Sequence, residues 1–275
     1  MNKIPLLVGC LAPIFLLTAC PDETSGVKTL VNQCAQSDIN AKNMIYFGPS
    51  NNVGPGSIWT NDKGGNGYHI RFTLTDMPMP QPFLNVGNSF QCNGTNAITL
   101  TSNADISAAI NALPLSADAS NAFKRATSVT VSLTSASWDD VKEGPYEAYI
   151  DALAPTSSIR KDIDTGERLV MIRALRVSGF SEKLSFDTND ASSLQAKYTG
   201  PLPAGTTGNV GATLSGSWDD AHNLTITSNG DFYIEGELSE YTTTGLAAAG
   251  TSPFKDPGGI PIDPKAPVVV DKAPS

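Results

Sequence analysis

The sequence predicts a single α+β domain dominated by antiparallel β-strands, and three observations support that fold class. The chain has 275 residues, which is enough for one domain with a sizeable core. It contains 24 glycines and only 16% charged residues, a composition that suits a β-rich fold. Short apolar runs separated by turn residues recur along the chain, whereas helical periodicity is concentrated near residues 104–126 and 145–154.

The first part of the domain contains the pattern of strands and turns. Residues 44–47 and 58–60 are short runs of apolar, aromatic and β-branched residues, and each predicts a strand. The Gly-rich turn 61–67 joins the second run to residues 68–74, which predicts a hairpin. Residues 77–82 alternate with proline and predict an extended loop, because a residue before proline avoids the helical region.

Two helices are predicted between the strands at residues 98–100 and 129–133. Ser102 or Asn103 can cap the first helix, because their side chains can accept bonds from free backbone N–H groups. Pro114 separates this helix from the second one, since proline interrupts helical hydrogen bonding. The order of strand, helix pair and strand favours a βαβ-like unit.

The second half contains one further helix and the longest predicted strand. Pro145 suits the first turn of a helix that ends before Pro155. Residues 168–179 are apolar on both alternating faces, which predicts a central strand covered on both sides. Asn229-Gly230 lies between two β-like runs and predicts a β-hairpin.

The composition changes at about residue 250, which predicts a globular domain over residues 30–249. Prolines and Gly258-Gly259 mark residues 250–275 as a flexible, partly polyproline tail. Residues 268–270 are three consecutive valines that could add to a sheet edge. Disorder is the interpretation preferred for them here.

Residues 1–19 have the three parts of a secretory signal peptide. Lys3 precedes an apolar run that ends in small residues, and Pro5 and Pro13 interrupt that run. The run is shorter than the roughly 20 apolar residues that a membrane-spanning helix needs. Cleavage at its end would leave residues 20–29 as a short polar tether.

The motif Leu17-Thr18-Ala19-Cys20 at the end of this run resembles the lipobox of bacterial lipoproteins. The resemblance implies that Cys20 is lipidated and becomes the mature N-terminus, held at a membrane by acyl chains. Leu7-Val8-Gly9-Cys10 has a similar pattern, but cleavage there would leave about six apolar residues where roughly 7–15 are expected. The resemblance also implies a place in the cell envelope. The outer membrane, facing the periplasm, is preferred to the inner membrane because Pro21 rather than Asp follows the lipidated residue.

The formal net charge of −9 excludes some partners. Nucleic acid is disfavoured because its phosphates would be repelled, and electrostatic docking on anionic lipid is disfavoured for the same reason. The partners expected are therefore the membrane, reached through the lipid, and an envelope protein or polymer.

Two cysteines remain once Cys10 is removed with the leader and Cys20 is acylated. Cys34 and Cys92 would face an oxidising compartment, which predicts a disulfide between them. Such a bond would contribute about 4 kcal/mol in the chain-entropy model. A redox or metal pair is the alternative, but the sequence has no C-x-x-C motif.

One internal repeat provides the candidate ligand site. Ser135-Ala136-Ser137-Trp138-Asp139-Asp140 recurs as Ser215-Gly216-Ser217-Trp218-Asp219-Asp220. The functional hypothesis is a Trp platform with paired carboxylates that stacks a sugar or holds Ca²⁺; its six residues are Trp138, Asp139, Asp140, Trp218, Asp219 and Asp220. The preferred interpretation is structural, with each strand ending in a turn, Trp in the core and Asp capping the backbone. No other cofactor and no metal ligand is assigned.

Catalytic signatures are missing from the sequence, which has no G-x-S-x-G, H-E-x-x-H or P-loop motif. His222 follows Asp220 and is interpreted as a solvated turn residue, and Asp187–Asp190 as an exposed turn. The sequence therefore predicts a membrane-anchored envelope lipoprotein with a non-catalytic binding or assembly role, and no catalytic residue is assigned. Two alternatives stay open: a lipid-anchored hydrolase of envelope polymers, and a surface-exposed adhesin or toxin-like factor.

Overall fold

The computed structural model describes residues 30, 44–61, 67–91, 97–164, 168–204, 213–242, 252–255 and 268–270. Within these ranges antiparallel strands dominate and five helices pack beside them in a single domain, which confirms the predicted α+β class. The leader, most of the tether and all four cysteines lie outside the described residues. Lipidation of Cys20 and the Cys34–Cys92 disulfide therefore stay predictions.

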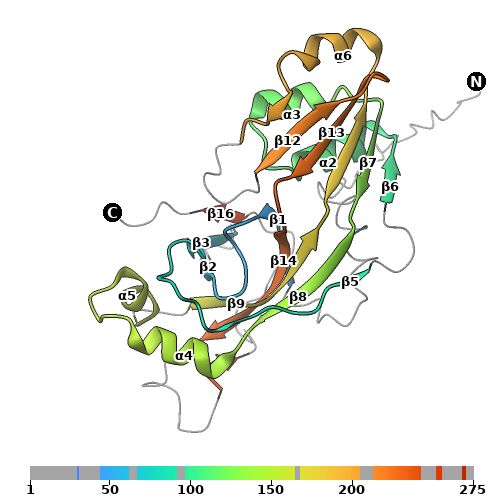
Figure 1. Ribbon diagram of the computed structural model, residues 1–275. Helices are drawn as coiled ribbons and strands as arrows, with labels where there is room; N and C mark the ends of the chain where they lie inside the picture. Colours follow the sequence, from blue (N-terminus) through green and yellow to red (C-terminus); the bar gives the residue numbers. More distant parts are fainter. Residues whose placement is uncertain are drawn as a thin grey trace, which may run out of the picture.

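A six-stranded antiparallel sheet forms one half of the domain, in the order β11-β12-β13-β10-β7-β6 (Figure 1). Its strands are β6 (Ala97–Leu100), β7 (Ser128–Ser132), β10 (Ser181–Ser185), β11 (Gly200–Pro201), β12 (Leu214–Trp218) and β13 (Asn223–Ser228). Along the longer strands apolar residues lie on one face and polar residues on the other, as the alternation along a strand requires, and Glu182 of β10 is an exception on the apolar face.

A ten-stranded sheet forms the other half, with the path β1-β14-β9-β2-β3-β16. Strand β8 pairs with β9, β4 and β5 pair with β8, and β15 pairs with β14. The strands are β1 (Met44–Ser50), β2 (Ile58–Asn61), β3 (Tyr68–Phe72), β4 (Leu84–Asn85), β5 (Phe90–Gln91), β8 (Ser135–Val141), β9 (Arg168–Ser178), β14 (Phe232–Tyr241), β15 (Phe254–Lys255) and β16 (Val268–Val270). The antiparallel pairing of β2 with β3 confirms the first predicted hairpin.

Three stretches of chain pass directly from one sheet into the other: β7 into β8, β9 into β10, and β13 into β14. Strand β10 lies between β13 and β7, and β9 lies between β14 and β8, so the three stretches are neighbours in both sheets. Gly179 bends the chain between β9 and β10 with φ +64°, and a Cβ there would lie 2.1 Å from the Thr134 hydroxyl oxygen. These three stretches hold the two halves together.

The hairpin predicted at Asn229-Gly230 is wrong. Strand β13 pairs on its two edges with β10 and β12, and β14 pairs with β9 and β1, so neither strand has an edge left for the other. The Asn229 N–H instead donates to the Thr213 carbonyl at 3.0 Å. The Asn-Gly pair therefore marks a change of sheet rather than a hairpin turn.

The helix pair between β6 and β7 is confirmed: it comprises α2 (Asn103–Asn111) and α3 (Ala117–Phe123). The Ser102 hydroxyl accepts from the Asp105 N–H at 3.1 Å, and the Ser116 hydroxyl accepts from the Ala119 N–H at 3.3 Å. The βαβ-like unit is wrong, because β6 and β7 are antiparallel neighbours. The chain therefore returns along β7 in the direction opposite to β6.

Three more helices complete the described part of the chain. Helix α4 (Glu143–Ala152) confirms the helix predicted near residues 145–154. Helix α5 (Ser158–Asp164) follows it and was not predicted. The turn expected at Asp187–Asp190 is wrong, because Asp187 precedes α6 (Thr188–Gln195) and Asp190 lies in its first turn.

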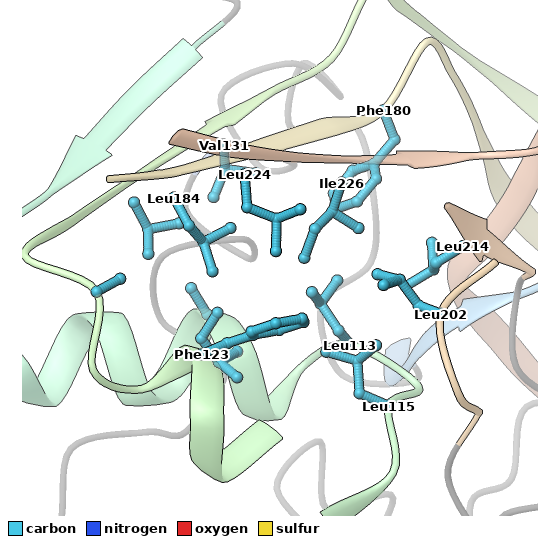
Figure 2. Packing of buried hydrophobic residues seen from close by; sticks show 14 of the residues in the cluster. Leu113, Leu115, Phe123, Val131, Phe180, Leu184, Leu202, Leu214, Leu224 and Ile226 are labelled. Carbon is cyan, nitrogen blue, oxygen red and sulfur yellow. The ribbon is translucent and has the colours of Figure 1, made fainter. Parts of the chain in front are cut away.

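The largest buried cluster lies between one face of the six-stranded sheet and the helices α2, α3 and α6. Figure 2 shows Val131, Leu184, Leu224 and Ile226 from the strands facing Phe123 from α3. Burying such side chains is the main source of stability for this half of the fold. Leu30 is fully buried in the same cluster.

Two parts of the predicted tail are strands. Phe254–Lys255 pairs with β14, and Val268–Val270 pairs in parallel with β3 at the edge of the ten-stranded sheet. The preference for disorder at residues 268–270 is therefore wrong, and the edge-strand alternative describes them. Pairing satisfies backbone groups that an extended apolar run would otherwise leave to water.

Candidate functional site

The two Trp-Asp-Asp segments lie in different sheets. Trp138, Asp139 and Asp140 belong to β8 of the ten-stranded sheet, whereas Trp218 ends β12 of the six-stranded sheet. The four carboxylates are all among the described residues, and in that part of the chain no three His, Cys, Asp or Glu side chains form a group that could hold a metal ion. The two copies of the motif therefore occupy different positions in the fold.

Asp139 is fully buried and is the centre of a hydrogen-bonded network. Its Oδ2 accepts from Arg176 Nε and from the Tyr233 hydroxyl, both at 2.8 Å. Its Oδ1 accepts from the Gly87 N–H at 2.9 Å and from the Ser137 hydroxyl at 3.3 Å. A buried carboxylate with a guanidinium partner and three further donors is the arrangement that makes a buried charge tolerable.

The neighbours of Asp139 show how tightly this network is built. A Cβ at Gly87 would lie 2.0 Å from the Trp138 carbonyl oxygen, so only glycine lets its N–H come this close to β8. Arg176 Nη1 also binds Asp231 Oδ2 at 2.7 Å. Burial, and then the hydrogen bond to Asp139, raises the pKa of the Tyr233 hydroxyl, which therefore stays protonated and donates.

Asp140 points to the opposite face of β8, because adjacent residues of a strand alternate. Arg173 Nε lies 3.0 Å from Asp140 Oδ1, and the Arg173 guanidinium lies 5.0 Å from the centre of the Trp138 ring. Burial raises the pKa of Asp140, and the nearby Arg173 charge partly offsets that effect. Trp138 thus packs against a cation and is not an open platform for a ligand.

The second segment forms a strand followed by a turn. Trp218 stacks on Phe186 with ring centres 5.5 Å apart and donates its Nε1–H to the Tyr198 carbonyl at 3.1 Å. Asp219 Oδ1 accepts from the backbone N–H groups of Ala221 and Asn223 at 3.0 and 2.9 Å. The Asn223 side-chain amide also donates to Asp219 Oδ1 and Oδ2, at 3.1 and 2.9 Å. The bonds from this amide, followed by the backbone bond from Asn223, lower the pKa of Asp219 to about 2.

The remaining residues of this turn lie at the surface. Asp220 is exposed, and His222 adopts φ +63°, a left-handed backbone conformation. Lys183 Nζ lies 3.4 Å from Asp219 Oδ2. The same six-residue motif therefore caps a turn in one place and supplies a buried ion pair in the other.

Glu182 is a buried carboxyl that the sequence reasoning missed. Its side chain is fully buried at the centre of the six-stranded sheet, and neither carboxyl oxygen has a hydrogen-bond partner. Its neighbours in the cross-strand register are Val131 and Ile226. Burial raises the pKa of Glu182 to about 8, so the carboxyl is largely protonated at pH 7.

The sequence contains a local signal for Glu182, Arg173 and Arg176. Glu182 and Leu184 occupy the inward positions of a five-residue alternating strand, which places a carboxyl among apolar neighbours. Arg173 and Arg176 interrupt the apolar run of β9, which marks them as partners for buried acids. Nothing local indicates Gly87, because its contact with β8 depends on the tertiary fold.

No family model matches the chain, and no curated protein matches it. Among solved structures the chain is similar to a bacterial gasdermin from Bradyrhizobium tropiciagri, with a TM-score of 0.45 and 14% sequence identity. The similarity covers 84% of this chain and 94% of that chain.

Proposed function

We propose that this chain is a lipid-anchored protein of the bacterial cell envelope with a non-catalytic binding or assembly role. The observation that carries the proposal is the motif Leu17-Thr18-Ala19-Cys20 at the end of an apolar leader. Several acyl chains on one cysteine hold a protein at a bilayer almost permanently, since each buried methylene contributes about 0.8 kcal/mol. The outer membrane, facing the periplasm, is the proposed location.

The described structure fits a short connection to the bilayer. Leu30 is buried in the cluster beside the six-stranded sheet, ten positions after Cys20. A fully extended chain of this length spans at most about 35 Å. Lipidation at Cys20 would therefore keep this half of the domain close to the membrane surface. No helix among the described residues combines the length and apolar character needed to cross a membrane.

The geometry of the carboxylates supports binding or assembly over hydrolysis. Asp139 and Asp140 point to opposite faces of β8, and each is paired with a different arginine. Asp219 is held ionised by donors in its own turn. A hydrolase that uses two carboxylates needs one of them protonated and both directed at the same substrate bond. These residues do not meet that requirement.

The anchor is tested with Cys20→Ala and, as the matched control, Cys10→Ala. We expect Cys20→Ala to lose the acylated form and to accumulate as precursor or released protein, whereas Cys10→Ala is acylated like the wild type. Membrane fractionation and mass spectrometry of the mature N-terminus measure both effects. A mature chain that begins at Cys10, or an unchanged acylated product in Cys20→Ala, would contradict the proposal.

A further inference from the structure

Glu182 lies beneath the helices α2 and α3, which pack beside one face of the six-stranded sheet; we call these two helices the helical layer (Figure 1). Glu182 shares the inward face of β10 with Leu184, because residues two apart in a strand point the same way. The same row continues through Val131 on β7 and Ile226 on β13, which are both fully buried. The strand register therefore places a carboxyl in the largest apolar cluster of the protein.

The helical layer presents an apolar surface to this carboxyl. Figure 2 shows Leu113 and Phe123 on the opposite side of the cluster from Leu224 and Ile226. In the described part of the chain neither carboxyl oxygen of Glu182 has a hydrogen-bond partner. A protonated carboxyl is tolerated in such surroundings far better than an ionised one, because a buried charge without a partner loses its hydration and gains nothing in return.

The charges of the surrounding elements do not compensate an ionised Glu182. Strands β7 and β13 carry no charged residue, and Lys183 of β10 alternates to the outer face of the sheet. Where the ten-stranded sheet adjoins the cluster, Arg173 is paired with Asp140 at 3.0 Å. Tyr46 and Tyr198 also belong to the cluster, but a hydroxyl supplies no positive charge. The charged residues of α2, α3, α6 and their flanks are half-buried or exposed; they are Asp105, Asp118, Lys124, Arg125, Asp187, Asp190 and Lys197.

The attachment of the helical layer depends mainly on apolar contacts. Helix α2 has nine residues and α3 has seven, fewer than the roughly 12–15 that an isolated helix needs for stability in water. Several of its buried residues are alanines, which bury little area; among them are Ala108, Ala109 and Ala119. The Ser116 N–H donates to the Pro203 carbonyl at 2.8 Å, at the point where the two helices meet. We therefore expect the layer to separate from the sheet at a lower free energy than the strands separate from one another.

We propose that Glu182 is a proton-controlled switch for the helical layer. With its proton the carboxyl stays beneath α2 and α3, and on losing the proton to water it becomes hydrated by separating these helices from the sheet. Opening exposes the apolar face that Val131, Leu184 and Ile226 form. The pKa of Glu182 is about 8 when it is buried and near the ordinary 4.5 when it is hydrated. Between these values the open form binds fewer protons than the closed form, so a rising pH favours opening.

The test is hydrogen exchange measured by mass spectrometry on the purified full-length protein. Glu182→Gln keeps the length of the side chain and cannot ionise. The ratio of wild-type to variant exchange rates in residues 103–123 should rise by up to about tenfold for each pH unit between about pH 5.5 and 7.5, because opening releases one proton. Comparing the two proteins at each pH removes the effect of pH on the exchange chemistry itself. Glu182→Met provides the same comparison with an apolar side chain, and it replaces the glutamine variant if that variant does not fold.

A second comparison separates local opening from unfolding of the whole domain. After correction for the chemical exchange rate, residues 103–123 of the wild type at pH 7.5 should exchange at least about tenfold faster than residues 168–178 of β9. Asp118→Asn is the matched control, because this exposed carboxylate lies in the first turn of α3 and should leave the wild-type behaviour unchanged. The proposal is overturned if the ratio of wild-type to variant rates is independent of pH. It is equally overturned if residues 103–123 exchange no faster than β9, since Glu182 would then act only through global unfolding.

Discussion

The two sheets differ in the number of hydrogen bonds that each provides to a buried carboxyl group. In the ten-stranded sheet, Asp139 is fully buried and accepts four hydrogen bonds, one of them from the Arg176 guanidinium. In the six-stranded sheet, Glu182 is equally buried, and its oxygens accept none. Two equally buried carboxyl groups can therefore have very different surroundings. The donors on neighbouring strands make the difference, because they compensate the burial of Asp139 and are missing at Glu182.

The strand register explains this difference. Arg176 lies directly opposite Ser137 of β8 on one side and Tyr233 of β14 on the other. This register places the donors Arg176 and Tyr233 on the same face as Asp139 and close to its carboxylate. The residues opposite Glu182 are Val131 and Ile226, which have no side-chain donor. The comparison predicts opposite responses when one group in each sheet is changed.

The largest effect is expected from Arg176→Leu. Removing the guanidinium leaves the Asp139 charge buried without its cation, which costs about 3–5 kcal/mol of unfolding free energy. Arg125→Leu is the control, because Arg125 forms an ion pair with Asp190 at the surface and should contribute at most about 1 kcal/mol. Urea unfolding measures both variants. A loss below 1 kcal/mol for Arg176→Leu would show that Asp139 does not depend on this pair.

The titration of Glu182 is expected to lower the free energy of unfolding as the pH rises, by less than Arg176→Leu lowers it. The pKa is about 8 in the folded chain and near the ordinary 4.5 when unfolded. Both states are protonated below pH 4.5, so the full stability is present there. Between pH 4.5 and 8 the unfolded state loses its proton first, and stability falls by up to about 1.4 kcal/mol per pH unit.

Glu182→Gln removes this titration and should flatten the dependence. Between pH 5 and 7.5 the wild type should lose about 3 kcal/mol more than the variant in urea unfolding. Exposed Glu143→Gln is the control and should follow the wild type. Parallel stability profiles for wild type and Glu182→Gln would mean that the buried carboxyl does not titrate in this range.

Tyr233→Phe should have a moderate effect in the ten-stranded sheet. It removes one donor to Asp139 and leaves the guanidinium in place, so the expected loss is about 2 kcal/mol, typical of a hydrogen bond to a charged group. Tyr149→Phe is the matched control, because the Tyr149 hydroxyl bonds at the surface to the Pro78 carbonyl. If thermal or urea unfolding gave equal losses for the two variants, the network around Asp139 would be no stronger than a surface bond.

The sequence predicts the strands and helices of this protein better than it predicts which strands pair and which side chains meet. Apolar runs, helical periodicity and capping residues are local signals, so β9 and the α2–α3 pair could be predicted directly. Sheet pairing is not local: Asn229-Gly230 has the composition of a hairpin turn, yet both flanking strands are already paired elsewhere. The role of Asp139 likewise depends on Gly87, Arg176 and Tyr233, which lie 52, 37 and 94 positions away.

The smallest effect is expected from metal ions at the repeated Trp-Asp-Asp segments. A shared Ca²⁺ site would stabilise the fold by about 2.7 kcal/mol at a hundredfold excess over the dissociation constant. We expect no shift, because Asp139 is saturated by its own donors and Asp219 binds Asn223, Ala221 and Lys183. Thermal melts of wild type and Asp219→Asn, each in EDTA and in millimolar Ca²⁺, test this expectation. A rise in melting temperature with Ca²⁺ that disappears in Asp219→Asn would contradict it, because only direct coordination by that carboxylate would couple the two changes.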